Sequence, residues 1–429
     1  MSHAAERIYY DEPWTLEFTA EVTAIREVAR VDGRQVWQIA LDRTAFYPTS
    51  GGQPNDTGKL TATARSGASL DAPVTDVEED ETGEVWHTTS KPLQEGTAVR
   101  GTVDSVRRRD HMQQHSGQHL LSAVLLRDFD AKTVSFHLGE DLSTIDLDGP
   151  ALDDAQFDQA VTRVNDVIAA ALPFSIRYVD QAEAEAMLAA GVLRKLPPRS
   201  GRIRIVEIGE GIDTNSCGGT HVATTAQIGP LLIRGTERVR NTMRLSFVCG
   251  DRAMRAAEAD FHLLKTLSQA LSTGVEAIAA SVGRLQADSK ATAKERATLL
   301  AELASLEAER MASRAAELTL ERGSILALTT RLDPRHSGRD ASYAKALASS
   351  LISTTSVALA LIGIAEPERM AVVLAAKPGV ADCGTLLRLT LETLGGRGGG
   401  GKDLAQGAMP TDRFDDLAAT IKAQVSQRD

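Results

Sequence analysis

The stretch that organises this sequence is DSVRRRDHMQQHSGQHLLSAVLLRDF, residues 104–129. Upstream of it, short apolar runs alternate with turns, whereas inside it the apolar residues recur with the period of a helix. Asp104 carries a side chain that can cap a helix, and no proline occurs before Phe129. We therefore predict a long helix over residues 106–129 with one buried face.

That helix carries the clearest chemical motif of the chain. His115 and His119 are four residues apart, which places both imidazoles on one face. A second pair with the same spacing, Cys217 and His221, adds a thiolate and a third imidazole. This donor set suits Zn²⁺, so we predict one zinc ion held by the four residues. Histidines that only pack or face solvent are the alternative, and His111 is a spare ligand or an outer-shell group.

The metal motif does not resemble that of a zinc peptidase. Such enzymes place a glutamate between the two histidines as general base, and none stands between His115 and His119.

The segment before Asp104 has the pattern of a β-domain. An Asp-Gly pair at 32–33 between two apolar runs predicts a hairpin. Four further short runs, at 59–64, 74–77, 84–87 and 98–103, are separated by turn residues. We predict a small β-barrel over residues 1–104.

The segments after the helix predict an α+β multidomain protein. Strands and helices are expected at 133–136, 143–147, 153–171, 174–179, 182–189, 203–208 and within 228–249, giving a zinc-containing α+β domain at 105–250. Residues 251–322 are rich in good helix formers and predict a helical hairpin or short coiled-coil arm. Residues 323–429 predict a compact α/β domain.

Two glycine motifs could meet a ligand. Gly51 and Gly52, before Gln53, permit positive φ and close approach of the backbone, although for the glycine pair alone a plain tight turn is the favoured interpretation. The stretch GGRGGGGK, residues 395–402, ends a helix and is either a flexible linker or a phosphate contact through Arg397 and Lys402. His137, at a polar hairpin tip, is structural on local grounds.

Charge restricts any nucleic-acid contact to local patches, because 47 Lys+Arg against 58 Asp+Glu leave a net charge of −11. Single exposed arginines are usually only solvated, but clusters near the predicted metal site favour such a contact. The clustered residues are Arg107, Arg108, Arg109, Arg194, Lys195, Arg199, Arg202 and Arg204.

The chain is expected to be soluble and cytoplasmic, with no membrane partner. Its longest uncharged apolar stretch, Val357 to Ala365, is far shorter than the ~20 residues of a membrane helix. Its three cysteines are odd in number and widely spaced, which favours a reducing compartment.

Taken together, these motifs resemble those of the free-standing alanyl-tRNA editing proteins, which are similar to the editing and C-terminal portions of alanyl-tRNA synthetase. The resemblance rests on FYPTSGGQ at 46–53, the histidine pair, Phe136-His137 with Thr144-Ile-Asp146, CGGTH at 217–221 and the late glycine stretch. It implies a zinc site, a Gly-Gly-Gln segment beside the aminoacyl pocket and a DHH-associated-like C-terminal domain that contacts tRNA. It further implies that Thr44 recognises a serine hydroxyl.

The resemblance predicts a trans-editing hydrolase that deacylates mischarged tRNA(Ala), chiefly Ser-tRNA(Ala) and, as a second candidate, Gly-tRNA(Ala). No aminoacylation domain precedes Met1, so we expect removal of amino acids and not attachment. We assign Thr44, Gln53 and Gln118 to catalysis. We assign substrate contacts to Gly51, Gly52, His137, Arg397 and Lys402.

Two other functions remain open on the sequence. A zinc-stabilised tRNA-binding module without catalysis would keep the metal and the basic clusters. A release-factor-like hydrolase could be argued from the Gly-Gly-Gln segment, but it would need no zinc. A homodimer through the helical or C-terminal region, and ATP binding by analogy with the synthetase, are further expectations.

Overall fold

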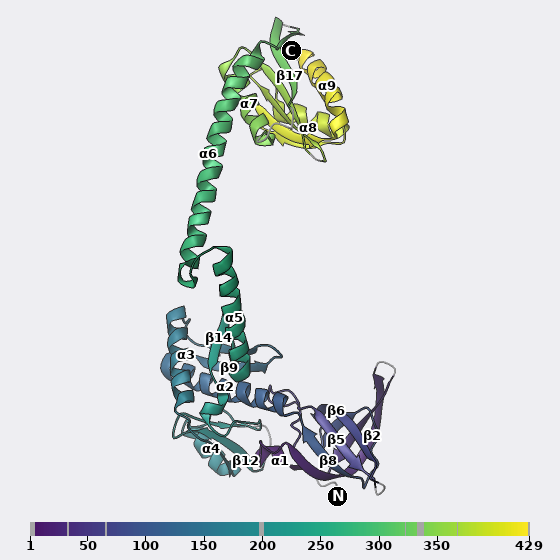
Figure 1. Ribbon diagram of the computed structural model, residues 1–429, viewed down its shortest axis with the longest axis vertical. Helices are drawn as coiled ribbons and strands as arrows, with labels where there is room; N and C mark the ends of the chain where they lie inside the picture. The colour runs from purple at the N-terminus through teal and green to yellow at the C-terminus, as the bar shows by residue number, and fades with distance from the viewer. Residues whose placement is uncertain are drawn as a thin grey trace. The chain divides into compact units, whose positions relative to one another are not determined.

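A computed structural model describes residues 5–31, 34–64, 67–196, 201–321, 323–332, 339–366 and 368–427. The chain divides into two compact units, Met1–Thr266 and Leu267–Asp429 (Figure 1). None of the helices described combines the length and the apolar character needed to cross a membrane.

The first unit begins with a closed six-stranded barrel of order β2-β3-β7-β6-β5-β8, as predicted. Alternate residues such as Ile39, Leu60 and Val77 are fully buried inside it. β2 and β3 pair antiparallel as the expected hairpin, and the predicted Asp32-Gly33 turn lies outside the described residues. The strands are β2 (Glu17–Val31), β3 (Arg34–Leu41), β5 (Gly58–Thr63), β6 (Ser69–Glu79), β7 (Val85–Thr89) and β8 (Ala98–Val103).

Three short elements, β1 (Glu6–Arg7), α1 (Ile8–Asp11) and β4 (Arg43–Thr44), lie beside the barrel. β1 pairs parallel with β4. The segment from β4 to Asp56 contains Gly51-Gly52-Gln53, and its Thr49 amide donates to the Val77 carbonyl of β6 at 3.0 Å.

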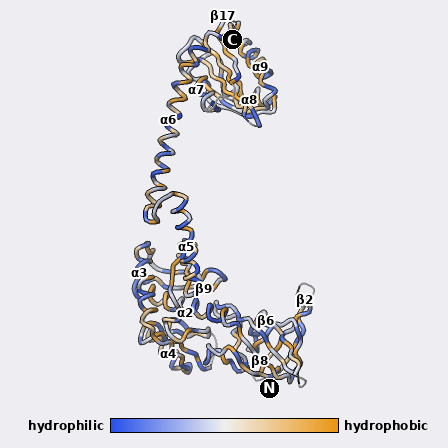
Figure 2. Tube along the Cα trace, viewed as in Figure 1, coloured by the Kyte–Doolittle hydropathy of each residue, from blue (hydrophilic) through white to orange (hydrophobic). Residues whose placement is uncertain are grey.

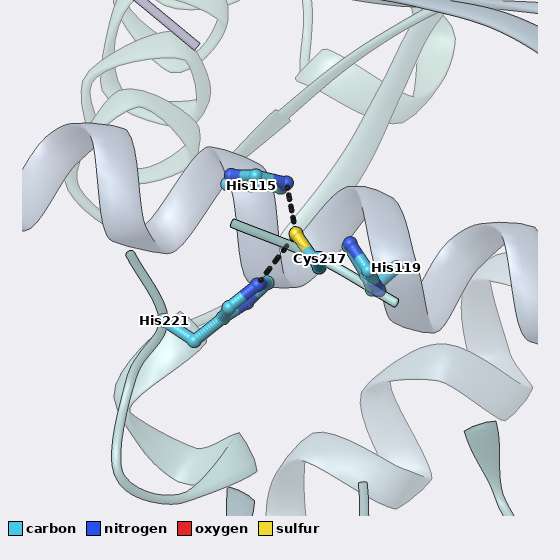
Figure 3. A group of neighbouring side chains, drawn as sticks. All are labelled: His115, His119, Cys217 and His221. Carbon is cyan, nitrogen blue, oxygen red and sulfur yellow. Dashed lines mark hydrogen bonds between the residues drawn. The ribbon is translucent and has the colours of Figure 1, made fainter. Parts of the chain in front are cut away.

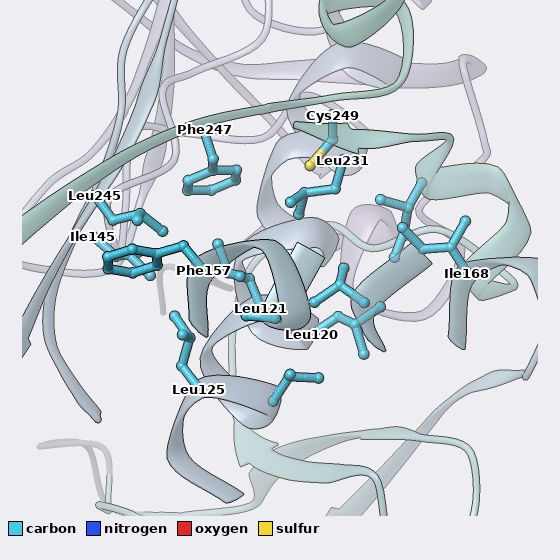
Figure 4. Packing of buried hydrophobic residues seen from close by; sticks show 14 of the residues in the cluster. Leu120, Leu121, Leu125, Ile145, Phe157, Ile168, Leu231, Leu245, Phe247 and Cys249 are labelled. Atoms are coloured by element: carbon cyan, nitrogen blue, oxygen red, sulfur yellow. The ribbon is translucent and has the colours of Figure 1, made fainter. Parts of the chain in front are cut away.

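The predicted helix is α2 (Ser105–Phe129), and Asp104 caps it by accepting from the amides of Val106 and Arg107. The prediction of a single buried face was wrong, because most of the helix is buried, including polar residues such as Gln114. Its second half packs in a core of leucines with Ile145, Phe157 and Phe247 (Figure 4). Specific hydrogen bonds satisfy most of its buried polar side chains, which an apolar pattern does not reveal, whereas Nδ1 of the buried His111 has no hydrogen-bond partner among the described residues.

Two antiparallel sheets and two helices surround α2. One sheet has the order β14-β15-β10-β9 and the other β11-β12-β13. Their bounds are β9 (Lys132–Leu138), β10 (Ser143–Asp148), β11 (Phe174–Val179), β12 (Ile203–Ile208), β13 (Asp213–Ser216), β14 (Leu231–Val239) and β15 (Thr242–Cys249), with α3 (Asp154–Ala169) and α4 (Gln181–Ala189). This order of elements confirms the predicted α+β organisation.

The helical region consists of α5 (Gly250–Ala270) and α6 (Ile278–Ala312). The start of α5 is tied to the first unit, because Arg252 donates to both oxygens of Asp110 on α2, at 2.8 and 2.6 Å. α6 is one continuous helix of 35 residues, about 52 Å long. Its C-terminal part packs on α7 (Ala341–Thr354), with Ala304 and Ala308 in the shared core.

The second unit is built on a six-stranded sheet of order β16-β17-β18-β19-β21-β20. Its central strands are hydrophobic throughout (Figure 2). The glycine-rich stretch forms the edge strand β20, so the linker alternative was wrong. Glycine is needed there because a Cβ on Gly398 would come within 2.6 Å of Leu391 on α8. The bounds are β16 (Ala316–Leu320), β17 (Gly323–Leu332), β18 (Leu359–Ala365), β19 (Met370–Ala376), β20 (Arg397–Gly400) and β21 (Leu404–Met409), with α8 (Cys383–Thr393) and α9 (Phe414–Ser426).

Candidate metal centre

Four side chains of the first unit converge on one point (Figure 3). His115 and His119 come from consecutive turns of α2, and Cys217 and His221 come from the segment after β13. One ligand atom from each lies within 4.8 Å of all the others. The structure thus brings together the four residues that the sequence predicted as ligands.

The spacing of the donor atoms fits a tetrahedral zinc site. Cys217 Sγ lies 3.5 Å from His115 Nε2 and 3.3 Å from His221 Nε2. With Zn–S of about 2.3 Å and Zn–N of about 2.05 Å, a tetrahedron would separate sulfur and nitrogen by about 3.6 Å. The cluster could therefore bind a metal ion once its widest donor separation, up to 4.8 Å, closes to the tetrahedral value. His111 is not part of it.

Gln53 orients the ring of His115 through a hydrogen bond to its Nδ1. Its Oε1 accepts from His115 Nδ1 at 2.7 Å and from the Thr220 amide at 3.1 Å, and its Nε2 donates to Thr220 Oγ1 at 2.8 Å. This bond leaves Nε2 of His115 free for a metal. Gln53 is fully buried, and these contacts favour a positioning role; the catalytic role expected for it stays a prediction.

The other two histidines have their own partners at Nδ1. His119 Nδ1 lies 3.3 Å from Asp213 Oδ2, and His221 Nδ1 lies 3.2 Å from Ser116 Oγ. Asp213 is buried and also pairs with Arg194, which balances its charge. Partners of this kind fix the ring orientation and the tautomer of a metal-binding histidine.

The cluster stabilises a thiolate. Burial opposes ionisation of Cys217, but the imidazoles of His115, His221 and His119 outweigh it and hold the thiol pKa well below its usual value. Burial lowers the pKa of His221 to about 3. For His119, burial is outweighed by the Cys217 thiolate and Asp213, which raise the pKa to about 9. A thiolate and neutral imidazoles are the forms of these side chains that bind a divalent cation.

A pocket of about 470 Å³ opens over the cluster. His115, His119 and Cys217 line it together with Tyr47, Ser50, Gly51 and residues 132–136 of β9. Its charged lining residues are Lys132, Arg194 and Lys195, and no carboxylate is among the described residues that line it. The pocket is therefore suited to an anionic ligand.

Gln118 faces this pocket and belongs to a chain of hydrogen bonds. Its Nε2 donates to Ser122 Oγ at 2.9 Å, and Ser122 Oγ lies 2.7 Å from Thr133 Oγ1. Because either hydroxyl can be the donor in the second contact, Thr133 can present a donor or an acceptor to the pocket.

Thr44 does not line the pocket, contrary to its expected contact with a serine hydroxyl. It is fully buried, and its Oγ1 lies 2.8 Å from His87 Nε2. His87 Nδ1 donates to the Ile39 carbonyl at 2.9 Å, so Nε2 is the acceptor and the threonine hydroxyl is the donor. The same hydroxyl accepts from the Phe46 amide at 3.1 Å. No proton remains for a substrate.

The glycine pair takes the positive φ values that the sequence predicted, +60° for Gly51 and +85° for Gly52. Gly51 lines the pocket, and a Cβ on Gly52 would lie 3.0 Å from the Phe136 carbonyl oxygen. His137 is exposed on β9 and does not line the pocket, although its neighbour Phe136 does.

Two of the clustered arginines were wrongly expected to contact nucleic acid. Arg108 is buried and forms a salt bridge with the buried Asp56. Arg204 is buried too, and it donates to backbone carbonyls. Of the remaining cluster, Lys195 lines the pocket, and Arg199 lies outside the described residues.

The outer residues Asp213, Ser116, Ser122 and Thr133 were not anticipated. Asp213 stands four residues before Cys217, but nothing in the sequence pairs it with His119. Some of these contacts join segments that lie far apart along the chain, and the others involve ordinary polar residues of α2. No local sequence pattern therefore identifies them.

Comparison with known proteins identifies the families and relatives that the chain resembles. Residues 1–107 match tRNA synthetases class II (A), and residues 203–245 match the threonyl and alanyl tRNA synthetase second additional domain. The alanine–tRNA ligase of Natronomonas pharaonis is 30% identical over 410 residues, which are 94% of this chain and 42% of the ligase.

Two relatives are named as editing proteins. The alanyl-tRNA editing protein Aarsd1 of Mus musculus is 36% identical over 275 residues, 62% of this chain and 62% of the mouse protein. Aarsd1-A of Xenopus laevis is 34% identical over 296 residues, 68% of this chain and 67% of that protein. The match thus spans about three fifths of the mouse relative's length. With these similarities, the chain belongs to the family of alanyl-tRNA editing proteins.

Proposed function

We propose that this protein hydrolyses the ester bond between tRNA(Ala) and a wrong amino acid, chiefly serine and also glycine, in the cytoplasm. The observation that carries this proposal is the His/Cys cluster at one wall of a cationic pocket, in a member of the editing family. Lys132, Arg194 and Lys195 would bind phosphates near the 3′ end of the tRNA.

We propose zinc as the metal, held by His115, His119, Cys217 and His221. A zinc ion bound there would supply Lewis-acid polarisation of the ester carbonyl or an activated water. The protein contributes the orientation of each ligand and a pocket that holds the ester next to them. Because four ligands fill a tetrahedral shell, the residues also fit a site that only shapes the pocket.

Selectivity is assigned to the chain of hydrogen bonds from Gln118 through Ser122 to Thr133, in place of Thr44. A serine hydroxyl would complete this chain, whereas the methyl group of alanine would exclude water and leave a polar group unpaired, at about 1–3 kcal/mol. Glycine leaves room for a water in the same position. We therefore expect the order Ser, then Gly, then Ala in hydrolysis rate.

The test is deacylation of Ser-tRNA(Ala), Gly-tRNA(Ala) and Ala-tRNA(Ala), with and without a chelator, together with elemental analysis. We expect one zinc per chain, loss of activity with chelator and loss of stoichiometric zinc in His119→Ala and Cys217→Ala. His262→Ala is the matched control, because that exposed histidine on α5 is outside the cluster.

Two outcomes would redirect the proposal. Zinc and tRNA binding without hydrolysis above the rate of free Ser-tRNA(Ala) would favour the non-catalytic binding module. Full activity in a protein without any metal would reject the zinc-dependent reaction.

For the second unit we propose a tRNA contact through Arg397 and Lys402 and a homodimer through α6. Both cations are exposed, and among the described residues neither forms an ion pair. α6 has three exposed leucines, Leu285, Leu299 and Leu306, whose exposed fractions are 56%, 57% and 68%. A second copy of the chain packed on α6 would cover them. Measurement of the molecular mass in solution tests the dimer.

A further inference from the structure

Cys217 is the one ligand whose direction no side-chain hydrogen bond can set. Each of the three histidines has a second ring nitrogen, and each uses it to bond an outer partner. A thiolate has no second polar atom, so the backbone must fix the direction of Sγ.

That backbone is flexible by composition, because Gly218 and Gly219 follow the cysteine. Glycine is required at 219, since a Cβ there would overlap the ring of His115. Two adjacent glycines have more accessible backbone conformations than any other pair. One internal contact restrains the segment, because the Gly219 amide donates to Cys217 Sγ at 3.4 Å. Any further restraint on its conformation must come from outside the segment.

Arg204 on β12 supplies contacts at both ends of this flexible step. Its Nη1 donates to the carbonyl of Cys217 at 2.6 Å and to that of Gly219 at 3.1 Å. Its own carbonyl accepts from the Cys217 amide at 3.2 Å. Its Nε donates to the Tyr10 carbonyl at 2.9 Å, which anchors the guanidinium to α1.

The arrangement is not the one that would best serve stability alone. Arg204 is only 7% exposed, and its Nη2 is buried without a hydrogen-bond partner among the described residues. An unpaired buried donor is unfavourable for folding. The guanidinium donates at once to the carbonyls of Cys217 and Gly219 and to that of Tyr10 on α1. An ammonium could not reach all three.

We propose that Arg204 is a positioning residue that clamps the Cys217–Gly219 segment and so sets the direction of the thiolate at the metal centre. This inference rests on the proposed zinc site. It assigns Arg204 no contact with substrate. It predicts that the clamp controls metal retention and not only the stability of the fold.

The experiment compares Arg204→Gln with Arg202→Gln in the full chain. Arg202 is exposed at the start of the same strand and stacks on Tyr178, with 4.9 Å from its Cζ to the ring centroid. We expect zinc transfer to a chromogenic chelator to be 10–100 times faster in Arg204→Gln, as for other outer-shell changes, and unchanged in Arg202→Gln. In the cobalt-substituted protein, the thiolate-to-metal charge-transfer band should weaken in Arg204→Gln only.

A rescue variant separates positioning from folding. Gly218 does not have a positive φ, and a Cβ there would meet only the Tyr10 ring, at 3.7 Å. Gly218→Ala should therefore stiffen the segment and slow zinc release again in the Arg204→Gln background. Should Arg204→Gln misfold, Arg204→Lys is measured in the same way, and we expect intermediate release.

The inference is overturned if the folded Arg204→Gln or Arg204→Lys protein releases zinc within twofold of the wild-type rate. It is also overturned if Gly218→Ala leaves the faster release unchanged. A wild-type protein that holds no zinc would instead reject the proposed metal site, so the two failures are distinguishable.

Discussion

The buried pair of Arg108 and Asp56 should dominate the stability of the N-terminal part of the first unit. Arg108 is 1% exposed and Asp56 is fully buried. The guanidinium also donates to the carbonyls of Pro13 and Ala45, and Asp56 accepts from the Tyr47 amide at 2.7 Å. The pair therefore fastens the segment that carries Gly51-Gly52-Gln53 to the start of α2.

Arg108→Met would leave the Asp56 charge buried and unpaired. Removal of one partner of such a pair costs about 3–5 kcal/mol, which raises the unfolding equilibrium constant by roughly 10²–10⁴. For a denaturant dependence of about 2 kcal/mol per M, the urea midpoint should fall by roughly 2 M. Asp56→Asn in the same protein should recover part of this loss, because an amide carries no charge.

Tryptophan fluorescence is the assay for this change. The three tryptophans, Trp14, Trp37 and Trp86, all precede Asp104, so the signal follows the barrel and its attached segments. Arg109→Met is the matched control, because Arg109 forms an exposed pair with Asp251, and such pairs contribute about 0–1 kcal/mol. A midpoint of Arg108→Met equal to that of the control would refute this reasoning.

Three further results are expected. Thr133→Val should lower the ratio of serine to alanine hydrolysis by about tenfold, whereas Thr44→Val should leave it unchanged; the opposite pattern would restore Thr44 as the selecting residue. Burial lowers the pKa of His87 to about 4. As the pH falls from 6.5 towards 4, the unfolded chain therefore binds a proton that the folded chain does not, and the free energy of unfolding decreases. This loss should reach about 3 kcal/mol by pH 4 in urea titrations and be absent from His87→Gln, and equal losses in both proteins would contradict it. Arg397→Gln and Lys402→Gln should each reduce the log–log salt slope of tRNA binding by about one, and an unchanged slope would argue against a phosphate contact.

Local patterns were enough for most of the secondary structure and for the donor set. The helix of residues 105–129 follows from its apolar period and the Asp104 cap, and the barrel strands follow from alternation between turns. The ligands His115, His119, Cys217 and His221 were visible because spacing within a few residues reports which side chains share a face. Edge strands β16 and β20 and helix α9 were missed. Glycines carry no period in β20, whereas α9 buries Phe414, Leu417, Ile421 and Val425 at helical spacing, so its signal was present in the sequence.

The roles of the buried polar residues depended on contacts between segments that lie far apart in the chain. Gln53 meets Thr220 across 167 residues, and Arg108 meets Asp56 across 52. A glutamine or arginine has the same local signal whether it faces solvent, a substrate or a buried partner. Only packing removes water from such a group and forces it to find its hydrogen bonds inside the protein. For that reason the structure places Gln53, Thr44, Arg108 and Arg204 in buried hydrogen-bond networks that their local sequence does not indicate. The catalytic role expected of Gln53 stays a prediction.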